Sequence, residues 1–127
     1  MTDPNVLTKE VAERFIAQEV FRIFYLNQFT SIQDAAAEVL AKYQGSSLDL
    51  RGLTSLSDSS AASLGKFTGE LDLRGLTDLP DTVAQGIGKY QKVLNLNGLT
   101  SLSDASAESL GKHHGELFLA RLKRLSE

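Results

Sequence analysis

Asp49 and Asp72 are the two residues whose type and spacing come nearest to chemistry in this sequence. Each lies in an L-D-L-R tetrapeptide, and the two tetrapeptides start 23 residues apart. On neighbouring strands the two carboxylates would lie about 4.8 Å apart, close enough to bind a cation or to act as an acid–base pair. Arg51 and Arg74 follow two residues later on the same strand face and can offset both charges diagonally. We therefore expect a solvated sheet face of mixed charge instead of a catalytic or metal site.

Three Gly-Lys pairs suggest a phosphate-binding loop, namely Gly65-Lys66, Gly88-Lys89 and Gly111-Lys112. A P-loop requires a Ser or Thr after the lysine and a glycine at a fixed distance before it, and it leads into a helix N-terminus. None of the three pairs meets these requirements, and the apolar pattern puts all three late in predicted helices. We expect the glycines to allow close packing between helices and the lysines to lie in the last turn, where the helix dipole favours a cation.

His113 and His114 are the only histidines, and the chain has no cysteine. Adjacent helix positions point about 100° apart, so the two rings are poorly placed to chelate one metal ion. His113 falls at the position that Tyr43, Phe67 and Tyr90 occupy elsewhere, which predicts a partly buried ring. No G-x-S-x-G nucleophile motif occurs either. The sequence therefore predicts a protein that is not an enzyme and that needs no cofactor or metal.

The elements that must position these side chains come from a repeat. Three gapless copies of 23 residues follow one another: LDLRGLTSLSDSSAASLGKFTGE from Leu48, LDLRGLTDLPDTVAQGIGKYQKV from Leu71 and LNLNGLTSLSDASAESLGKHHGE from Leu94. Alternation in the first half of each copy predicts a short strand with its leucines on one face, and the second half has apolar residues at helical spacing. Tandem strand–helix units predict an α/β fold with a parallel sheet on one side and helices on the other.

The pattern extends in both directions, and the whole chain (1–127) is predicted to form a single domain. Residues 24–47 fit the template with one extra residue, which makes four repeats over 24–116. Residues 117–127 match the first half of a further unit. Residues 1–23 are predicted to contain an amphipathic cap helix that begins at Thr8 and covers the first strand.

The repeat also predicts how each helix starts and stops. We expect one aspartate per unit to cap the helix N-terminus: Asp34, Asp58, Asp81 and Asp104. Glycines near the unit ends are expected to stop the helix in a left-handed conformation: Gly45, Gly69 and Gly115. Unit 71–93 has Gly86 and Gly88 inside its helical segment, and each costs about 1 kcal/mol relative to alanine. We therefore expect this helix to be the shortest or least regular.

The last eleven residues, LFLARLKRLSE, fit two structures. The repeat template predicts a strand first, whereas Phe118, Leu122 and Leu125 also lie at the i, i+4, i+7 spacing of a helix. We favour the strand. An apolar strand at the end of a sheet invites pairing with another chain, so a homodimer through residues 117–127 is one hypothesis.

The motif G-L-T-x-L-S-D-x-x-A-x-x-L, in 48–69 and again in 94–115, resembles bacterial leucine-rich-repeat proteins and is similar to the ribonuclease-inhibitor type. The resemblance covers about Phe24 to Leu125 and implies a right-handed horseshoe with the sheet on the concave side, and a role in protein–protein interaction. The usual turn asparagine of the family is not evident. Threonines stand near its place and could form a hydroxyl ladder instead: Thr30, Thr54, Thr77 and Thr100.

Outward-facing strand positions form two tracks across the predicted sheet. One track reads Tyr25, Asp49, Asp72, Asn95, Phe118, and the other reads Asn27, Arg51, Arg74, Asn97, Ala120. In repeat proteins such a surface usually carries recognition. We therefore predict a non-enzymatic module that binds a protein or peptide on the strand face. The alternative is a structural unit that assembles through its C-terminal edge.

Composition narrows the choice of partners. The net charge is −3, so a general attraction to nucleic acid or to an anionic membrane is not expected. No apolar stretch approaches bilayer length, and no apolar run follows a basic N-terminal segment as in a signal peptide. We expect a soluble protein and favour the cytoplasm.

Overall fold

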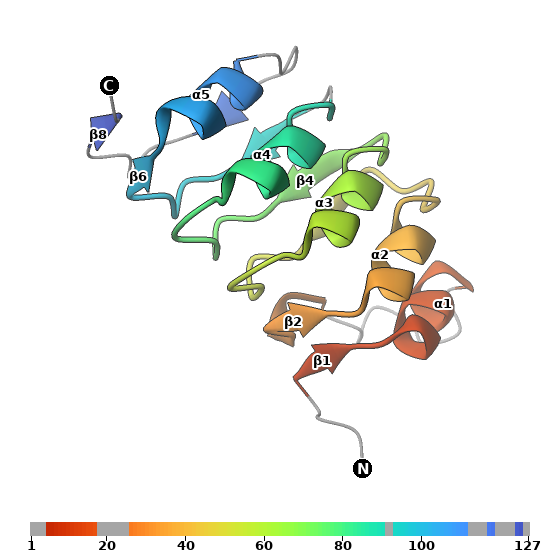
Figure 1. Cartoon of the computed structure of the whole chain (residues 1–127). Helices are drawn as coiled ribbons and strands as arrows, with labels where there is room; N and C mark the ends of the chain where they lie inside the picture. The colour runs from red at the N-terminus through yellow and green to blue at the C-terminus, as the bar shows by residue number, and fades with distance from the viewer. Residues whose placement is uncertain (1–4, 18–25, 91–92, 112–116, 119–123, 126–127) are drawn as a thin grey trace.

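The computed structural model describes residues 5–17, 26–90, 93–111, 117–118 and 124–125. Its described part forms five α-helices, which lie in a row in chain order (Figure 1). They are α1 (Lys9–Ala17), α2 (Asp34–Leu40), α3 (Asp58–Leu64), α4 (Asp81–Ile87) and α5 (Asp104–Leu110), with a short 3-10 turn η1 (Leu26–Gln28). Each helix packs against the next one along the chain.

Short parallel strands accompany the helices. β3 (Ser47–Asp49), β4 (Glu70–Asp72), β5 (Leu94–Asn95) and β7 (Leu117–Phe118) form one sheet in that order. Its register aligns Leu48, Leu71, Leu94 and Leu117, so neighbouring strands are offset by the 23-residue repeat. Two further parallel pairs join β1 (Val6–Leu7) to β2 (Ser31–Ile32) and β6 (Ser101–Leu102) to β8 (Arg124–Leu125). The predicted α/β class with parallel strands is confirmed.

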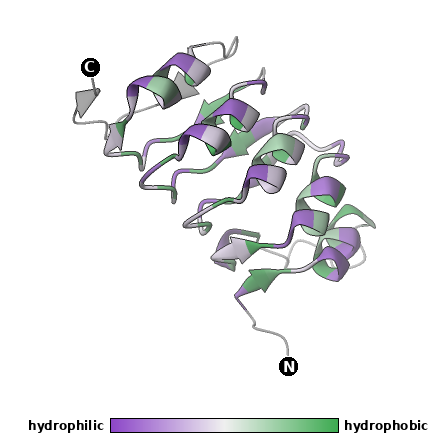
Figure 2. Ribbon diagram, in the orientation of Figure 1, coloured by the Kyte–Doolittle hydropathy of each residue, from purple (hydrophilic) through white to green (hydrophobic). Residues whose placement is uncertain are grey.

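The core is one apolar cluster built from the same positions of successive units. Leu50, Leu73 and Leu96 are completely buried, as are Leu53 and Leu99. Hydrophilic residues recur along the helix row, and β1 is hydrophobic (Figure 2). Burial of a leucine contributes about 1.5–3 kcal/mol, so the repeated leucines are the main stabilising term of the fold.

The N-terminal helix starts where the sequence predicts. Thr8 caps α1, because its side-chain oxygen accepts from the backbone N–H of Val11 at 3.3 Å. α1 packs beside α2 in the helix row. The first predicted strand begins at Phe24, outside the described residues, so the cover of that strand by α1 stays a prediction. Leu7 pairs with Ile32, the residue at the same place in the next unit, so this segment repeats the second half of a unit.

Aspartates do not cap the following helices, so that prediction is wrong. The N-cap residues stand one position earlier: Gln33, Ser57, Pro80 and Ser103. Ser57 accepts from Ser60 N at 3.0 Å and Ser103 from Ser106 N at 3.1 Å. Serine is as good a cap as aspartate, and this leaves each aspartate at the first helical position with its carboxylate available to a neighbouring unit.

Helix ends also differ from the expectation. The residues after the helices, Ala41, Gly65, Gly88 and Gly111, keep right-handed conformations with φ between −61° and −63°. Lys66 and Lys89 therefore lie just beyond the last turn instead of within it, and Lys112 lies outside the described residues. Gly45 and Gly69 do not adopt a left-handed φ, and Gly115 lies outside the described residues. Gly69 is needed for close approach, since a Cβ there would lie 2.6 Å from the Ser46 carbonyl oxygen of the preceding unit.

Helix α4 is seven residues long, the same as α5, so the expectation of a shorter helix is wrong. Its glycines stand where neighbouring helices touch. A Cβ on Gly86 would lie 2.9 Å from Ala62 N, and one on Gly65 would lie 2.5 Å from the Gly86 carbonyl oxygen. The backbone contacts made through these glycines offset their low helix propensity. The prediction of glycine-mediated helix packing is confirmed for Gly65 and for Gly88, whose Cβ would lie 2.4 Å from the Ser109 carbonyl oxygen, but not for Gly111, where a Cβ would meet only its own turn.

The threonines link units through backbone carbonyls instead of through hydroxyls alone. Thr54 donates from its N–H at 3.1 Å and from its hydroxyl at 3.4 Å to the Thr30 carbonyl. Thr100 does the same to Thr77, at 3.3 and 3.5 Å. These bonds tie the turns after neighbouring strands together.

At the C-terminal end, β7 and β8 confirm the strand reading for residues 117–118 and 124–125. Residues 119–123 lie outside the described part. Within the part of the chain that the structure describes, no helix is long and apolar enough to cross a membrane.

Candidate functional site

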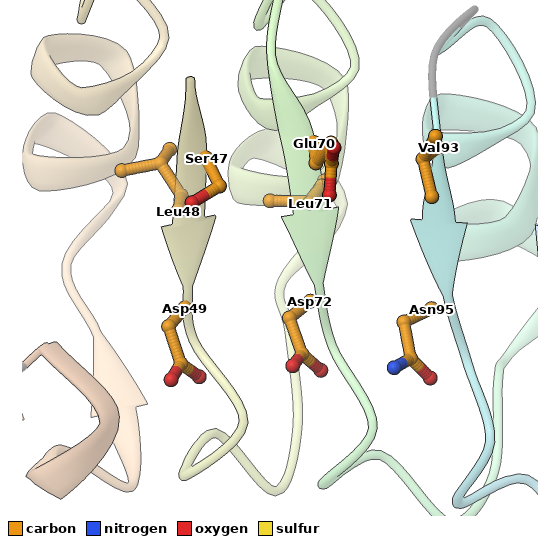
Figure 3. Close-up of a pocket in the computed structure, with 8 residues that line it drawn as sticks. All are labelled: Ser47, Leu48, Asp49, Glu70, Leu71, Asp72, Val93 and Asn95. Atoms are coloured by element: carbon orange, nitrogen blue, oxygen red, sulfur yellow. The ribbon is translucent and has the colours of Figure 1, made fainter. Parts of the chain in front are cut away.

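Three side chains stand in a row where three neighbouring strands end. The register of β3, β4 and β5 places Asp49 beside Asp72 and Asp72 beside Asn95. Figure 3 shows the three side chains pointing the same way. They point away from the core because the flanking leucines are buried on the other face, which follows from strand alternation. The sequence prediction of one shared track is confirmed for these three residues.

The row borders an open depression of about 250 Å³ on the strand face. Residues of β3, β4 and β5, with one residue before β5, line it: Ser47, Leu48, Asp49, Glu70, Leu71, Asp72, Val93 and Asn95 (Figure 3). Sequence reasoning missed Ser47, Glu70 and Val93. Alternation could have found them, since each lies two residues before a track residue and therefore faces the same side.

Each aspartate forms an ion pair with the arginine two residues further on. The Arg74 guanidinium contacts Asp72, with Nη2 at 2.9 Å from Oδ2 and Nε at 3.1 Å from the same oxygen. Arg51 Nε lies 3.4 Å from Asp49 Oδ2. The expected charge compensation is confirmed, although the pairs form within a unit instead of diagonally across strands.

Backbone N–H groups also donate hydrogen bonds to side-chain oxygens of the three residues in the row. Asp49 accepts from the N–H of Arg51 at 3.3 Å and Asp72 from the N–H of Arg74 at 3.1 Å. Asn95 accepts from the N–H of Asn97 at 2.9 Å. This repeated turn provides hydrogen-bond donors for the side-chain oxygens and fixes the direction of the three side chains.

Asn27 extends the polar surface toward the N-terminal side. Its side-chain amide donates to Asp49 Oδ2 at 3.3 Å from the turn η1 that lies beside β3. Of the other predicted track residues, Phe118 pairs in register with Asn95, whereas Tyr25 and Ala120 lie outside the described residues. The structure therefore assembles the central part of both predicted tracks.

The row offers little for metal binding. No cluster of three or more metal-ligating side chains occurs within the described ranges. The two aspartates are already held by arginines and backbone donors, which leaves few lone pairs for a cation.

Tyr90 occupies the aromatic position of its unit and has a structural role. Its ring is fully buried, and its hydroxyl contacts the carbonyl oxygens of Val93, at 2.8 Å, and Gly69. Burial raises the pKa of the Tyr90 hydroxyl, with the charge of Glu70 adding to the effect. In earlier units Tyr43 stacks on Phe67 with ring centroids 6.2 Å apart. The predicted buried ring at residue 113 lies outside the described residues.

Comparison with protein-family models, with curated proteins and with solved structures finds no match to this chain.

Proposed function

We propose that this chain is a right-handed leucine-rich-repeat solenoid whose strand face binds a protein or peptide, without enzymatic activity. The observation that carries the proposal is the row of Asp49, Asp72 and Asn95 along one open depression. A regular row on parallel strands presents side chains at one spacing, which suits recognition of an extended segment.

The repeat geometry supports the solenoid part of the proposal. Strands of four successive units pair in parallel at an offset of 23 residues, and the helices follow in the same order. Threonines bond to the turn of the previous unit, in the region where this family uses asparagine. Each unit contacts its neighbours along the array, as in one-dimensional repeat proteins.

The arginines give the face its binding groups. The side chains of Arg51 and Arg74 are 47% and 46% exposed while their Nε atoms are held by aspartate. A guanidinium has five N–H donors, so each arginine retains donors for a carboxylate or carbonyl of the partner. Its own aspartate orients it before binding, which reduces the entropy lost on association.

A peptide that fits this face would be extended and polar, with alternating charges. The depression itself is lined by Glu70 and the two aspartates, and each aspartate is paired with an arginine. Positive groups of the partner would pair with these carboxylates, and negative groups of the partner would pair with the arginines. The described strands are only two or three residues long, so we expect a small interface of modest affinity.

A displayed random-peptide library, selected against the purified chain, tests this proposal. Selected peptides should bind the Arg51→Ala/Arg74→Ala double variant at least about tenfold more weakly, since two charge-assisted contacts are lost. The matched control is Lys66→Ala/Lys89→Ala, which removes the same charge from exposed residues after the helices. Equal weakening by both double variants would show a general charge effect and overturn the strand face as the binding site.

A further inference from the structure

A second depression lies between the C-terminal ends of α2 and α3. It is an open groove of about 300 Å³. Residues of both helices, and residues that follow each of them, line the groove: Glu38, Ala41, Lys42, Ser63 and Lys66. None of these residues lines the depression on the strand face, so the groove is a separate site.

The residue that follows α2 accounts for a groove at this junction. It is Ala41, whereas glycine follows α3 and α4. A Cβ on Gly65 would lie 2.5 Å from the Gly86 carbonyl oxygen, and one on Gly88 would lie 2.4 Å from that of Ser109. Ala41 has the methyl group that these contacts exclude. The end of α2 therefore cannot approach the next helix as closely as a glycine would allow.

Two ammonium groups face this space, one from each side. Lys42 and Lys66 hold the same place in successive units, and both are exposed. Packed helices lie about 8–10 Å apart and lysine has a flexible four-carbon stem, so both ammonium groups can contact one anion between them. The lining has two positive charges against the one negative charge of Glu38, in a chain whose net charge is −3.

The helix dipole explains a lysine after each helix but not the groove. Lys89 follows α4 in the same way and complements its dipole, yet it does not line the groove. The feature that distinguishes Lys42 and Lys66 is the space between them. Lys89 therefore provides a control for any binding at this place.

The polar groups of the lining match a phosphate ester that also has hydroxyl groups. A phosphate monoester has a charge of about −1.5 to −2 near pH 7, which two ammonium groups can balance. The Ser63 hydroxyl can donate a further hydrogen bond to the phosphate. Glu38 repels phosphate itself, but an ionised carboxylate accepts hydrogen bonds and therefore favours a ligand with a hydroxyl beside its phosphate.

We propose that the groove between the ends of α2 and α3 binds a small, free phosphate monoester that carries hydroxyl groups. Lys42 and Lys66 hold the phosphate, Ser63 donates to it, and Glu38 accepts from a hydroxyl of the ligand. This is not a P-loop, because side chains at helix C-terminal ends hold the anion instead of backbone N–H groups at a helix N-terminus. The site is open to solvent, so we expect a dissociation constant of about 1 mM.

Nuclear magnetic resonance titration of the 127-residue chain with glycerol 3-phosphate tests the proposal. Backbone amide signals of residues 38–42 and 63–66 should shift as the site fills. Ethyl phosphate has the same charge without a free hydroxyl and should bind about threefold more weakly, since it offers no donor to Glu38. In Glu38→Ala the two probes should bind alike. No shift in these residues up to about 50 mM glycerol 3-phosphate would overturn the proposal.

Three variants locate the binding. Lys42→Gln/Lys66→Gln should weaken glycerol 3-phosphate binding at least about tenfold, whereas Lys9→Gln/Lys89→Gln removes the same charge outside the groove and should have little effect. Ala41→Leu fills the groove and leaves the charge unchanged, so it should also weaken binding. Unchanged circular dichroism shows that each variant folds. Equal weakening by the two lysine double variants, or full binding by Ala41→Leu, would each show that the groove is not the site.

Discussion

The Ser103 hydroxyl donates a 2.6 Å hydrogen bond to the carboxylate of Asp81, the first helical residue of the preceding unit. The same hydroxyl accepts from the backbone N–H of Ser106, so one side chain caps its own helix and ties it to the helix before. Ser106 adds a second bond to Asp81 at 2.9 Å. Asp34 has the same two bonds, to Ser57 and Ser60. Stability between units therefore depends on these junctions as well as on the leucine core.

Replacing Ser103 by alanine removes both functions. Loss of a serine N-cap costs about 1 kcal/mol, which lowers the melting temperature of a domain of this size by about 3–6 °C. Ser55→Ala, at an exposed position outside the helices, is the matched control. Thermal melts followed by circular dichroism compare the two variants. Equal melting temperatures for Ser103→Ala and the control would contradict the role of this junction.

Acid should weaken the same junctions. The serine hydroxyls at Asp34 and Asp81 hold the pKa of both carboxyls below their ordinary value of 3.8. A carboxyl whose pKa is lower in the folded state contributes stability that is complete above its unfolded pKa and is lost as the pH falls through the folded pKa. The unmodified chain should therefore be more stable than Asp34→Asn/Asp81→Asn near neutral pH, and this difference should shrink below about pH 4.

Denaturant unfolding at a series of pH values measures that difference. Asp78→Asn serves as control, because Asp78 is an exposed carboxylate outside the helices. A difference in free energy of unfolding that stays constant from neutral pH to pH 2 would show that the two carboxylates are not the titrating groups.

Gly86 should resist substitution although it lies inside a helix. Alanine gains about 1 kcal/mol in helix propensity, but its Cβ would lie 2.9 Å from Ala62 N and 3.2 Å from Ala61 Cβ. Overpacking of this kind costs about 1–3 kcal/mol, so a net loss of stability is expected in denaturant unfolding. Gly111→Ala, which meets only its own turn, should be neutral or slightly stabilising. A stabilised Gly86→Ala variant would show that α3 and α4 are not held together this closely.

The sequence predicted those features that depend on periodicity. The register Leu48–Leu71–Leu94 follows from the 23-residue period, and the outward direction of Asp49 and Asp72 follows from strand alternation. The sequence predictions were wrong where two adjacent residues are both suited to the same structural role. Ser57 and Asp58 are both good caps, and only the backbone path decides that the serine caps while the aspartate accepts from Thr82 of the following unit. Helix propensity alone predicts that glycine weakens α4, because the contact between helices through Gly86 is not visible in the sequence of one unit.

Tyr90 provides the most local test of the core. Its buried hydroxyl contacts two backbone carbonyls, of Val93 in its own unit and Gly69 in the one before, so phenylalanine would leave both acceptors without this donor. Loss of a buried hydrogen bond costs about 1–3 kcal/mol, whereas Tyr43→Phe, at a partly exposed ring of the same column, should change stability by less than about 0.5 kcal/mol. Denaturant unfolding of both variants gives the comparison. If Tyr90→Phe were as stable as Tyr43→Phe, the hydroxyl would not be the link between β4 and β5 that its position indicates.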